Sequence, residues 1–175
     1  EIGEALSLVR AEITDVAHAA VTQTDATMLS GETASGKDPV RAVEAMANIL
    51  EETESSLARF TRSTWEDIHN EREARAKAAV AMSESLHLPI VVFTRSGCTA
   101  ENVSKFRPSI SVITFTNTAF IQRHLRLFFG LYPLLLPFKE DPESTLQHAF
   151  KLIKKAGFKK INFKDSKIVV LSGDK

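Results

Sequence analysis

The sequence predicts an α/β protein in two unequal parts. In the longer, second part, short β-branched runs alternate with segments of helical periodicity, which is the pattern of a mostly parallel sheet with helices on both faces. In the shorter, first part, a single apolar run lies between two helical segments. The first part is therefore a slice of α/β architecture, and its one strand has no second strand nearby in the sequence to complete a sheet.

The first part contains a predicted helix over 10–23, a predicted strand over 25–30 and a second helix that begins at Pro39. Small apolar residues recur at helical spacing in 10–23, and the run 25–30 is apolar up to a glycine, as in a buried strand. Residues 35–39 have the composition of a turn. Because Pro39 suits the first turn of a helix and Asp38 suits the N-cap, we expect the second helix to start there and to be able to pass residue 57.

The second part follows a polar connector and continues to the end of the sequence. Its predicted helices are 74–86, 100–106, 119–129 and 144–156, and its predicted strands are 90–94, 111–116, 131–136 and 167–172. Prolines in the third of these strands place it at an edge of the sheet, because proline cannot donate to a ladder.

The overall charge and the cysteine content exclude several classes of protein. The 22 basic and 22 acidic residues give zero net charge, so no long-range field favours nucleic acid or a membrane surface. The apolar stretch 127–138 is too short to span a bilayer. The lone Cys98 excludes a disulfide framework and suits a reducing compartment, which we predict to be the cytoplasm.

The segment 31–38 matches the spacing G-x-x-x-x-G-K of a phosphate-binding loop. Asp38, however, stands where that motif needs a serine or threonine hydroxyl for magnesium, and Pro39 lacks a backbone N–H. We therefore predict a turn followed by a helix start, with a nucleotide-binding loop as the less favoured interpretation.

The segment 94–99 combines three hydroxyls, a glycine and an arginine between a predicted strand and a predicted helix. Backbone N–H groups at a helix N-terminus attract anions, Gly97 permits a close approach of the backbone, and Arg95 can add a charged contact. From the residues alone, an anion-binding loop and a polar cap without a ligand are equally good interpretations. The five histidines do not stand at metal-ligand spacing, and we predict no metal ligands in this chain.

Two stretches resemble a known family. Residues 10–19, RAEITDVAHA, and residues 24–34, TDATMLSGETA, are similar to the pyruvate kinase pattern R-A-E-x-x-D-V-A-N-A followed by T-D-x-x-M-L-S-G-E-[ST]-A, and the similarity continues to Val43. Segments 90–108, 130–133 and 167–173 resemble parts of the C-terminal domain of that family, with Lys167 at a position that is usually acidic.

The resemblance implies an architecture. Residues 1–59 would be the end of the catalytic (β/α)8 barrel, 60–71 a linker, and 72–175 the α/β effector domain without its last loop and strand. A piece of a longer protein would explain the lone strand at 25–30, because a barrel slice cannot close its own sheet.

The resemblance also implies an activity, namely phosphoryl transfer from phosphoenolpyruvate to ADP in a tetrameric enzyme that uses Mg²⁺ and K⁺. The segments that carry the family's metal ligands, catalytic lysine and substrate-binding arginine are not in this sequence, so we expect this piece alone to bind no cofactor and to show no turnover. The positions that match the family's site are supporting ones: Arg10, Glu12, Ser30 and Glu32. Val9 stands where the family usually has a threonine that reaches the substrate.

The family's second site would bind a sugar phosphate or AMP as an effector. The residues that match its effector loop are Thr94, Arg95, Ser96, Gly97 and Thr99, with Cys98 in place of a commoner basic or polar residue. The alternative to an enzyme part is a phosphate-sensing α/β module without catalytic activity, which would use the same loop.

Overall fold

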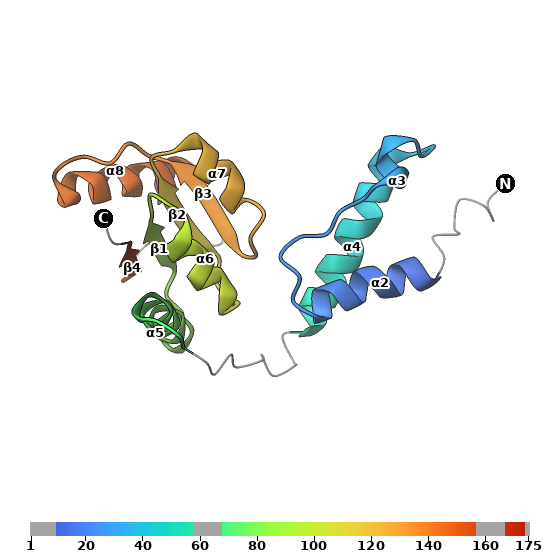
Figure 1. The fold of residues 1–175 in the computed structure, drawn as a ribbon, viewed down its shortest axis with the longest axis horizontal. Helices are drawn as coiled ribbons and strands as arrows, with labels where there is room; N and C mark the ends of the chain where they lie inside the picture. The colour runs from blue at the N-terminus through green and yellow to red at the C-terminus, as the bar shows by residue number, and fades with distance from the viewer. Residues whose placement is uncertain (1–9, 58–67, 157–166, 174–175) are drawn as a thin grey trace. The chain divides into compact units, whose positions relative to one another are not determined.

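The computed structural model describes residues 10–57, 68–156 and 167–173, and the chain forms two compact units, Glu1–Ser63 and Thr64–Lys175 (Figure 1). The first is helical where it is described, and the second contains a sheet covered by helices.

The N-terminal unit contains α2 (Arg10–Val21), the single-turn α3 (Gly31–Ala34) and α4 (Pro39–Leu57). Both α2 and α3 pack against α4. The Asp38 side chain accepts a hydrogen bond from the Arg41 N–H at 3.1 Å, as expected for the residue before a helix that starts with proline. The two predicted helices and this capping role are thereby confirmed.

The prediction of a strand over 25–30 is wrong. These residues form an irregular connection between α2 and α3, and residues 10–57 contain no strand at all. A strand is stabilised by the hydrogen bonds and side-chain contacts of its neighbours, so an apolar run without a neighbour gains little from the extended ladder conformation. Met28, in the middle of the run, is 83% exposed.

The C-terminal unit is built on four parallel strands in the order β3-β2-β1-β4. The strands are β1 (Ile90–Phe93), β2 (Val112–Thr116), β3 (Leu131–Leu135) and β4 (Val169–Ser172). β1 pairs with β2 on one side and with β4 on the other, with Ile90 opposite both Val112 and Val169. The prediction that the proline-containing strand lies at an edge is confirmed.

Helices cover both faces of this sheet, so the three-layer α/β prediction is confirmed. On one face, α5 (Glu71–Leu86), α6 (Cys98–Lys105) and α7 (Ala119–Leu125) contribute buried side chains to a cluster with Ile90 and Val92. On the other face, α8 (Pro142–Lys155) packs Ala149 and Ile153 against Val91, Ile113 and Phe115 (Figure 1). Alternation of side chains along β1 therefore supplies both layers of the core.

Of the helices, α5 and α7 differ most in extent from their predicted ranges. α5 begins three residues before 74, because the Asn70 side chain accepts a hydrogen bond from the Glu73 N–H at 3.0 Å and caps the helix. α7 ends at Leu125 instead of 129, because the N–H groups of Leu127 and Phe128 bond to carbonyls three residues back and tighten the chain out of the helix.

The packing of α8 on the sheet gives a stability prediction. Ile153 is 1% exposed, so Ile153→Ala should lower the free energy of unfolding of the C-terminal unit by about 2–5 kcal/mol through lost burial and a cavity. Phe120→Ala is the matched control, since Phe120 is 66% exposed and its loss should cost less than about 0.5 kcal/mol. Urea denaturation followed by circular dichroism measures both. Equal effects of the two substitutions would contradict the packing described here.

Candidate functional site

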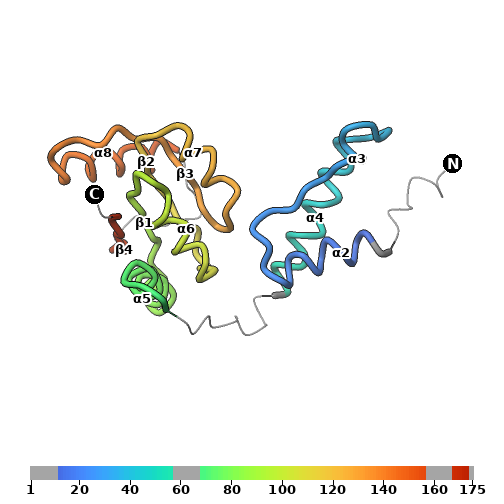
Figure 2. Tube along the Cα trace, in the orientation of Figure 1, coloured from blue at the N-terminus to red at the C-terminus, as the bar shows by residue number. Residues whose placement is uncertain are grey.

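The connection between β1 and α6 lies at the carboxyl edge of the sheet, where the strand order changes direction. The chain goes from β1 to β2 and β3 on one side, and then returns to place β4 on the other side of β1 (Figure 2). In open α/β sheets, ligands bind in the crevice at this kind of position. The segment 94–99, which we call the β1–α6 loop, is therefore the candidate site of the C-terminal unit.

Thr94 anchors this loop to the sheet. It is 2% exposed, and its N–H donates to the Phe115 carbonyl of β2 at 2.9 Å. Its hydroxyl oxygen accepts the Gly97 N–H, also at 2.9 Å. The buried Thr94 hydroxyl thus stabilises the turn between Thr94 and Gly97.

Gly97 occupies a position that favours glycine on two grounds. Its φ of +96° lies in the left-handed region, and a Cβ there would lie 3.1 Å from Glu101 Oε1 and 3.4 Å from Ile121 Cγ2. The loop is thus packed against α7 on one side and against the first turn of α6 on the other.

The outer part of the loop is open to solvent. Arg95 and Ser96 are exposed, and the Ser96 hydroxyl oxygen accepts the Cys98 N–H at 3.4 Å. α6 starts directly after Gly97, so its first N–H groups point toward this region. A guanidinium, a hydroxyl and a helix N-terminus therefore lie together at the surface, which is the chemistry that binds a phosphate group.

The chain after β4 reaches the same loop. The Gly173 N–H donates to the Phe93 carbonyl at 2.9 Å, and a Cβ on Gly173 would lie only 2.6 Å from Thr99 Oγ1. Gly173 therefore belongs to the wall of the site. Sequence reasoning did not assign it, although a glycine directly after a predicted strand is a signal for close backbone approach.

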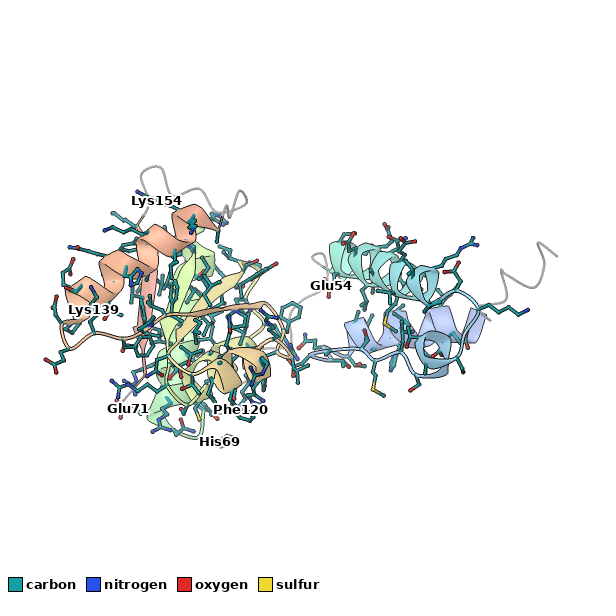
Figure 3. All side chains as sticks on the ribbon, turned by 90° about the horizontal axis from the view of Figure 1, so that it is seen from above. Glu54, His69, Glu71, Phe120, Lys139 and Lys154 are labelled. Atoms are coloured by element: carbon teal, nitrogen blue, oxygen red, sulfur yellow. The ribbon has the colours of Figure 1, made fainter. Side chains whose placement is uncertain are left out.

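Other charged groups surround the start of α6. His124 Nε2 lies 3.1 Å from Glu101 Oε1, which joins α7 to α6. An open hollow of about 570 Å³ is lined by residues from the starts of α5 and α6: Asn70, Glu71, Arg72, Arg75, Cys98, Glu101 and Asn102. Figure 3 shows Glu71 and His69 at this end of α5. Sequence reasoning missed this group, because its members are brought together only by the packing of two helices.

Glu73 lies beneath this surface and ties the start of α5 to the end of α6. Its carboxylate accepts the His69 N–H at 2.9 Å and pairs with Lys105 Nζ at 3.2 Å. The His69 hydrogen bond, followed by the interaction with Lys105, lowers the pKa of the Glu73 carboxyl below its ordinary value. Glu73 therefore stays charged at neutral pH, and its ion pair with Lys105 connects α5 to α6.

The supporting residues predicted in the N-terminal unit lie at the start of α3 and along α2. Ser30 and Glu32 are both exposed, and Glu32 Oε2 accepts the Ser30 N–H at 2.9 Å. Hydrogen bonds from the backbone N–H groups of Glu32 itself and of Ser30 lower the pKa of this carboxyl. Glu12 is exposed on α2, and no hydrogen bond or ion pair joins it to this pair within the described residues. Arg10 opens α2, while Val9 and the Arg10 side chain lie outside the described part.

The phosphate-binding-loop interpretation of 31–37 is wrong. The N–H groups of Thr33 and Ala34 bond to the Ser30 carbonyl, and that of Ser35 bonds to the Gly31 carbonyl. A Cβ on Gly36 would lie 2.2 Å from the Glu32 carbonyl oxygen, so this glycine serves the turn. Because these N–H groups close a helical turn, they are not available to cradle a phosphate, and the favoured prediction of a turn and a helix start is confirmed.

Gly97 gives a prediction specific to this loop. Gly97→Ala should lower the free energy of unfolding by about 1–2 kcal/mol through backbone strain, and by more through contact with Glu101. Gly130→Ala is the matched control, because Gly130 also has a positive φ but has open space where a Cβ would stand. Thermal unfolding of the two variants should show the larger loss for Gly97→Ala. A larger loss for Gly130→Ala would contradict the tight packing of the loop.

Within the described residues, no three side chains of histidine, cysteine, aspartate or glutamate gather closely enough to hold a metal ion. In the same part of the chain, no helix combines the length and apolar character needed to cross a membrane.

Comparison with known proteins gives consistent matches for both units. A family model described as "Pyruvate kinase, alpha/beta domain" matches residues 73–175, and one described as "Pyruvate kinase, barrel domain" matches residues 5–43. The chloroplastic pyruvate kinase isozyme G of Nicotiana tabacum is 40% identical over 147 residues, which cover 82% of this chain and 26% of that protein. The pyruvate kinase of Lactobacillus delbrueckii subsp. bulgaricus is 36% identical over 170 residues, which cover 93% and 28%.

The fold matches as well. The crystal structure of Cryptosporidium parvum pyruvate kinase aligns with a TM-score of 0.73 and 32% identity, over 85% of this chain and 32% of that one. The chain thus spans about a quarter to a third of the length of the relatives it matches. The model of the alpha/beta domain covers more than half of the residues of this chain, and this chain therefore belongs to the pyruvate kinase family.

Proposed function

We propose that this chain works as part of a pyruvate kinase, which transfers a phosphoryl group from phosphoenolpyruvate to ADP and yields pyruvate and ATP in glycolysis. The observation that carries the proposal is the pair of family matches, barrel domain first and α/β domain second, in one chain. Phosphoryl transfer depends on positioning and on cations around the moving group. The described residues do not fit a metal site, so no step of the reaction is assigned to a metal ion held by them. We propose that Mg²⁺ and K⁺ bind to other parts of the whole enzyme.

We propose supporting roles for four residues of the N-terminal unit. Barrel enzymes carry their chemistry at the carboxyl ends of the strands, and in the family Ser30 and Glu32 follow the eighth strand. The exposed Ser30 hydroxyl can donate or accept a proton, and the Glu32 carboxylate holds the Ser30 backbone through the 2.9 Å hydrogen bond. Arg10 and Glu12 are proposed to line the same rim of the active site.

We propose that the β1–α6 loop binds the phosphate of an effector, either a sugar phosphate or AMP. Arg95, Ser96 and Thr99 would contact the phosphate, while Thr94 and Gly97 shape the loop. The exposure of Arg95 beside the start of α6 supports this role. The same loop would serve a phosphate sensor without catalytic activity, which is the second candidate function.

We also propose a homotetramer and a cytoplasmic location for the enzyme. The lone cysteine, Cys98, suits the reducing conditions of the cytoplasm. The tobacco relative is named as a chloroplast protein, so detection of this protein in plastids would replace the cytoplasmic proposal.

A coupled assay tests the enzymatic proposal. Pyruvate formation from phosphoenolpyruvate and ADP, followed through the oxidation of NADH by lactate dehydrogenase, should be absent for the 175-residue chain and present for a longer protein that contains it. A heat-inactivated sample of each is the control. Turnover by the 175-residue chain would overturn the expectation for the piece, and inactivity of the longer protein with Mg²⁺ and K⁺ present would overturn the function.

Calorimetry tests the effector proposal and separates the two candidate functions. Fructose 1,6-bisphosphate or AMP at millimolar concentration should bind, and Arg95→Gln should weaken binding about tenfold or more through loss of a charge-assisted contact. Lys151→Gln, which removes an exposed charge from α8, is the matched control and should leave the affinity unchanged. Absence of binding to either compound would reject both an effector site and a phosphate sensor.

A further inference from the structure

We propose that the C-terminal unit carries a lysine patch that docks on an anionic lipid bilayer. The patch consists of four exposed side chains: Lys151, Lys154 and Lys155 of α8, and Lys167 before β4. It shares no residue with the β1–α6 loop, and the proposal does not depend on the enzymatic or effector-binding roles proposed above.

The charge of the chain is divided unevenly, although it sums to zero. Residues 144–167 contain seven lysines, no arginine and one acidic residue, which gives this segment a net charge of +6. The rest of the chain, with 15 basic and 21 acidic residues, therefore carries a net charge of −6. A neutral total removes the long-range field of the whole chain, but a local excess of cations still acts within a Debye length, which is about 8 Å at physiological salt.

The lysines of the patch gather at one edge of the sheet. In the chain, α8 follows the carboxyl end of β3 and precedes the amino end of β4, so the last turn of α8 and the start of β4 lie at the amino edge of the parallel sheet. Ile168, next to Lys167, packs against the hydrophobic cluster that contains Ile153, next to Lys154. Figure 3 shows Lys154 at the opposite end of α8 from Lys139. The β1–α6 loop, by contrast, follows the carboxyl end of β1.

The acidic residues at the start of α8 do not neutralise the patch. Lys151 follows Glu143 by eight residues, which is a rise of about 12 Å along the helix and more than a Debye length. Among the described residues, none forms an ion pair with a lysine of the patch. The described part of this edge therefore presents a positive surface to solvent.

Stabilisation of the helix end accounts for only part of the patch. Cations in the last turn interact favourably with the negative end of the helix dipole, and Lys154 and Lys155 lie in that turn. Lys151 precedes the last turn, and Lys167 lies outside the helix. The helix dipole therefore does not explain these two lysines, whereas an external anionic partner explains all four.

The composition of the patch favours a bilayer over a nucleic acid. Its cations are all lysines, and it contains neither the arginines nor the aromatic side chains that commonly contact bases. Clusters of lysines at a helix surface are attracted to anionic lipid headgroups without a shaped pocket. Because Ala149 and Ile153 of α8 are buried against the sheet, the contact with lipid is electrostatic and involves no insertion of the apolar face.

The test is co-sedimentation of the 175-residue chain with lipid vesicles at low salt. Phosphatidylcholine vesicles that contain about 30% phosphatidylserine should bind the protein at least about tenfold more tightly than vesicles of phosphatidylcholine alone. Because the contact is electrostatic, raising the salt to about 0.5 M should remove this preference.

A triple variant tests the patch itself. Replacement of Lys151, Lys154 and Lys155 by glutamine should weaken binding to the phosphatidylserine vesicles about tenfold or more, because each lysine contributes separately to the attraction. The three side chains are exposed, so thermal unfolding followed by circular dichroism should show that the variant still folds.

The matched control is a second triple variant, in which exposed basic residues elsewhere are replaced by glutamine: Lys37, Arg41 and Arg123. It lowers the net charge by the same amount and should bind the vesicles as the wild type does. Equal losses in the two triple variants, or equal binding of the wild type to both kinds of vesicle, would overturn the proposal. Tighter binding to a single-stranded oligonucleotide of about 20 nucleotides than to the phosphatidylserine vesicles, at the same salt, would also overturn it and assign the patch to nucleic acid.

Discussion

The placement of β1 between β2 and β4 is the constraint on which the C-terminal unit depends. Because the first strand of the sheet lies in its interior, the chain leaves β1 in one direction and returns on the other side. Two loops, after β1 and after β4, then meet at the same edge, and the Gly173 N–H is bonded to the Phe93 carbonyl at that point. The buried Thr94 hydroxyl uses this rigid base to hold Gly97, which in turn sets where α6 begins. The β1–α6 loop, whose outer residues are exposed, is therefore positioned by the buried strands beneath it.

Most of the C-terminal unit could be predicted from the sequence, because buried parallel strands have continuous apolar sequences bounded by turn residues. The predicted starts and ends of the helices are less accurate than the predicted strands. α6 begins at Cys98 and not at 100, since Gly97 takes a positive φ that ends the loop early. The pairing of Glu101 with His124, which are 23 positions apart, depends on how α7 packs on α6 and has no periodicity that a single sequence reveals.

The N-terminal unit shows the opposite case. The motif that identifies the family, TDATMLSGETA, also contains the residues whose predicted strand is wrong. Its apolar character is real, but a ladder needs a partner, and residues 10–57 supply none. A short motif can therefore identify a family while giving an incorrect local structure, because a strand needs neighbouring strands that these residues do not supply.

The two units consequently have different sources of stability. The C-terminal unit has two buried clusters, one on each face of its sheet, and can hold its own shape. In the N-terminal unit, no side chain described between residues 12 and 56 is fully buried, and Met28, Val40 and Val43 are exposed. Two packed helices and one helical turn bury too little apolar surface to offset the entropy of ordering the chain. The helices of this unit therefore leave apolar side chains exposed, whereas the β1–α6 loop is held by a core that lies within its own unit.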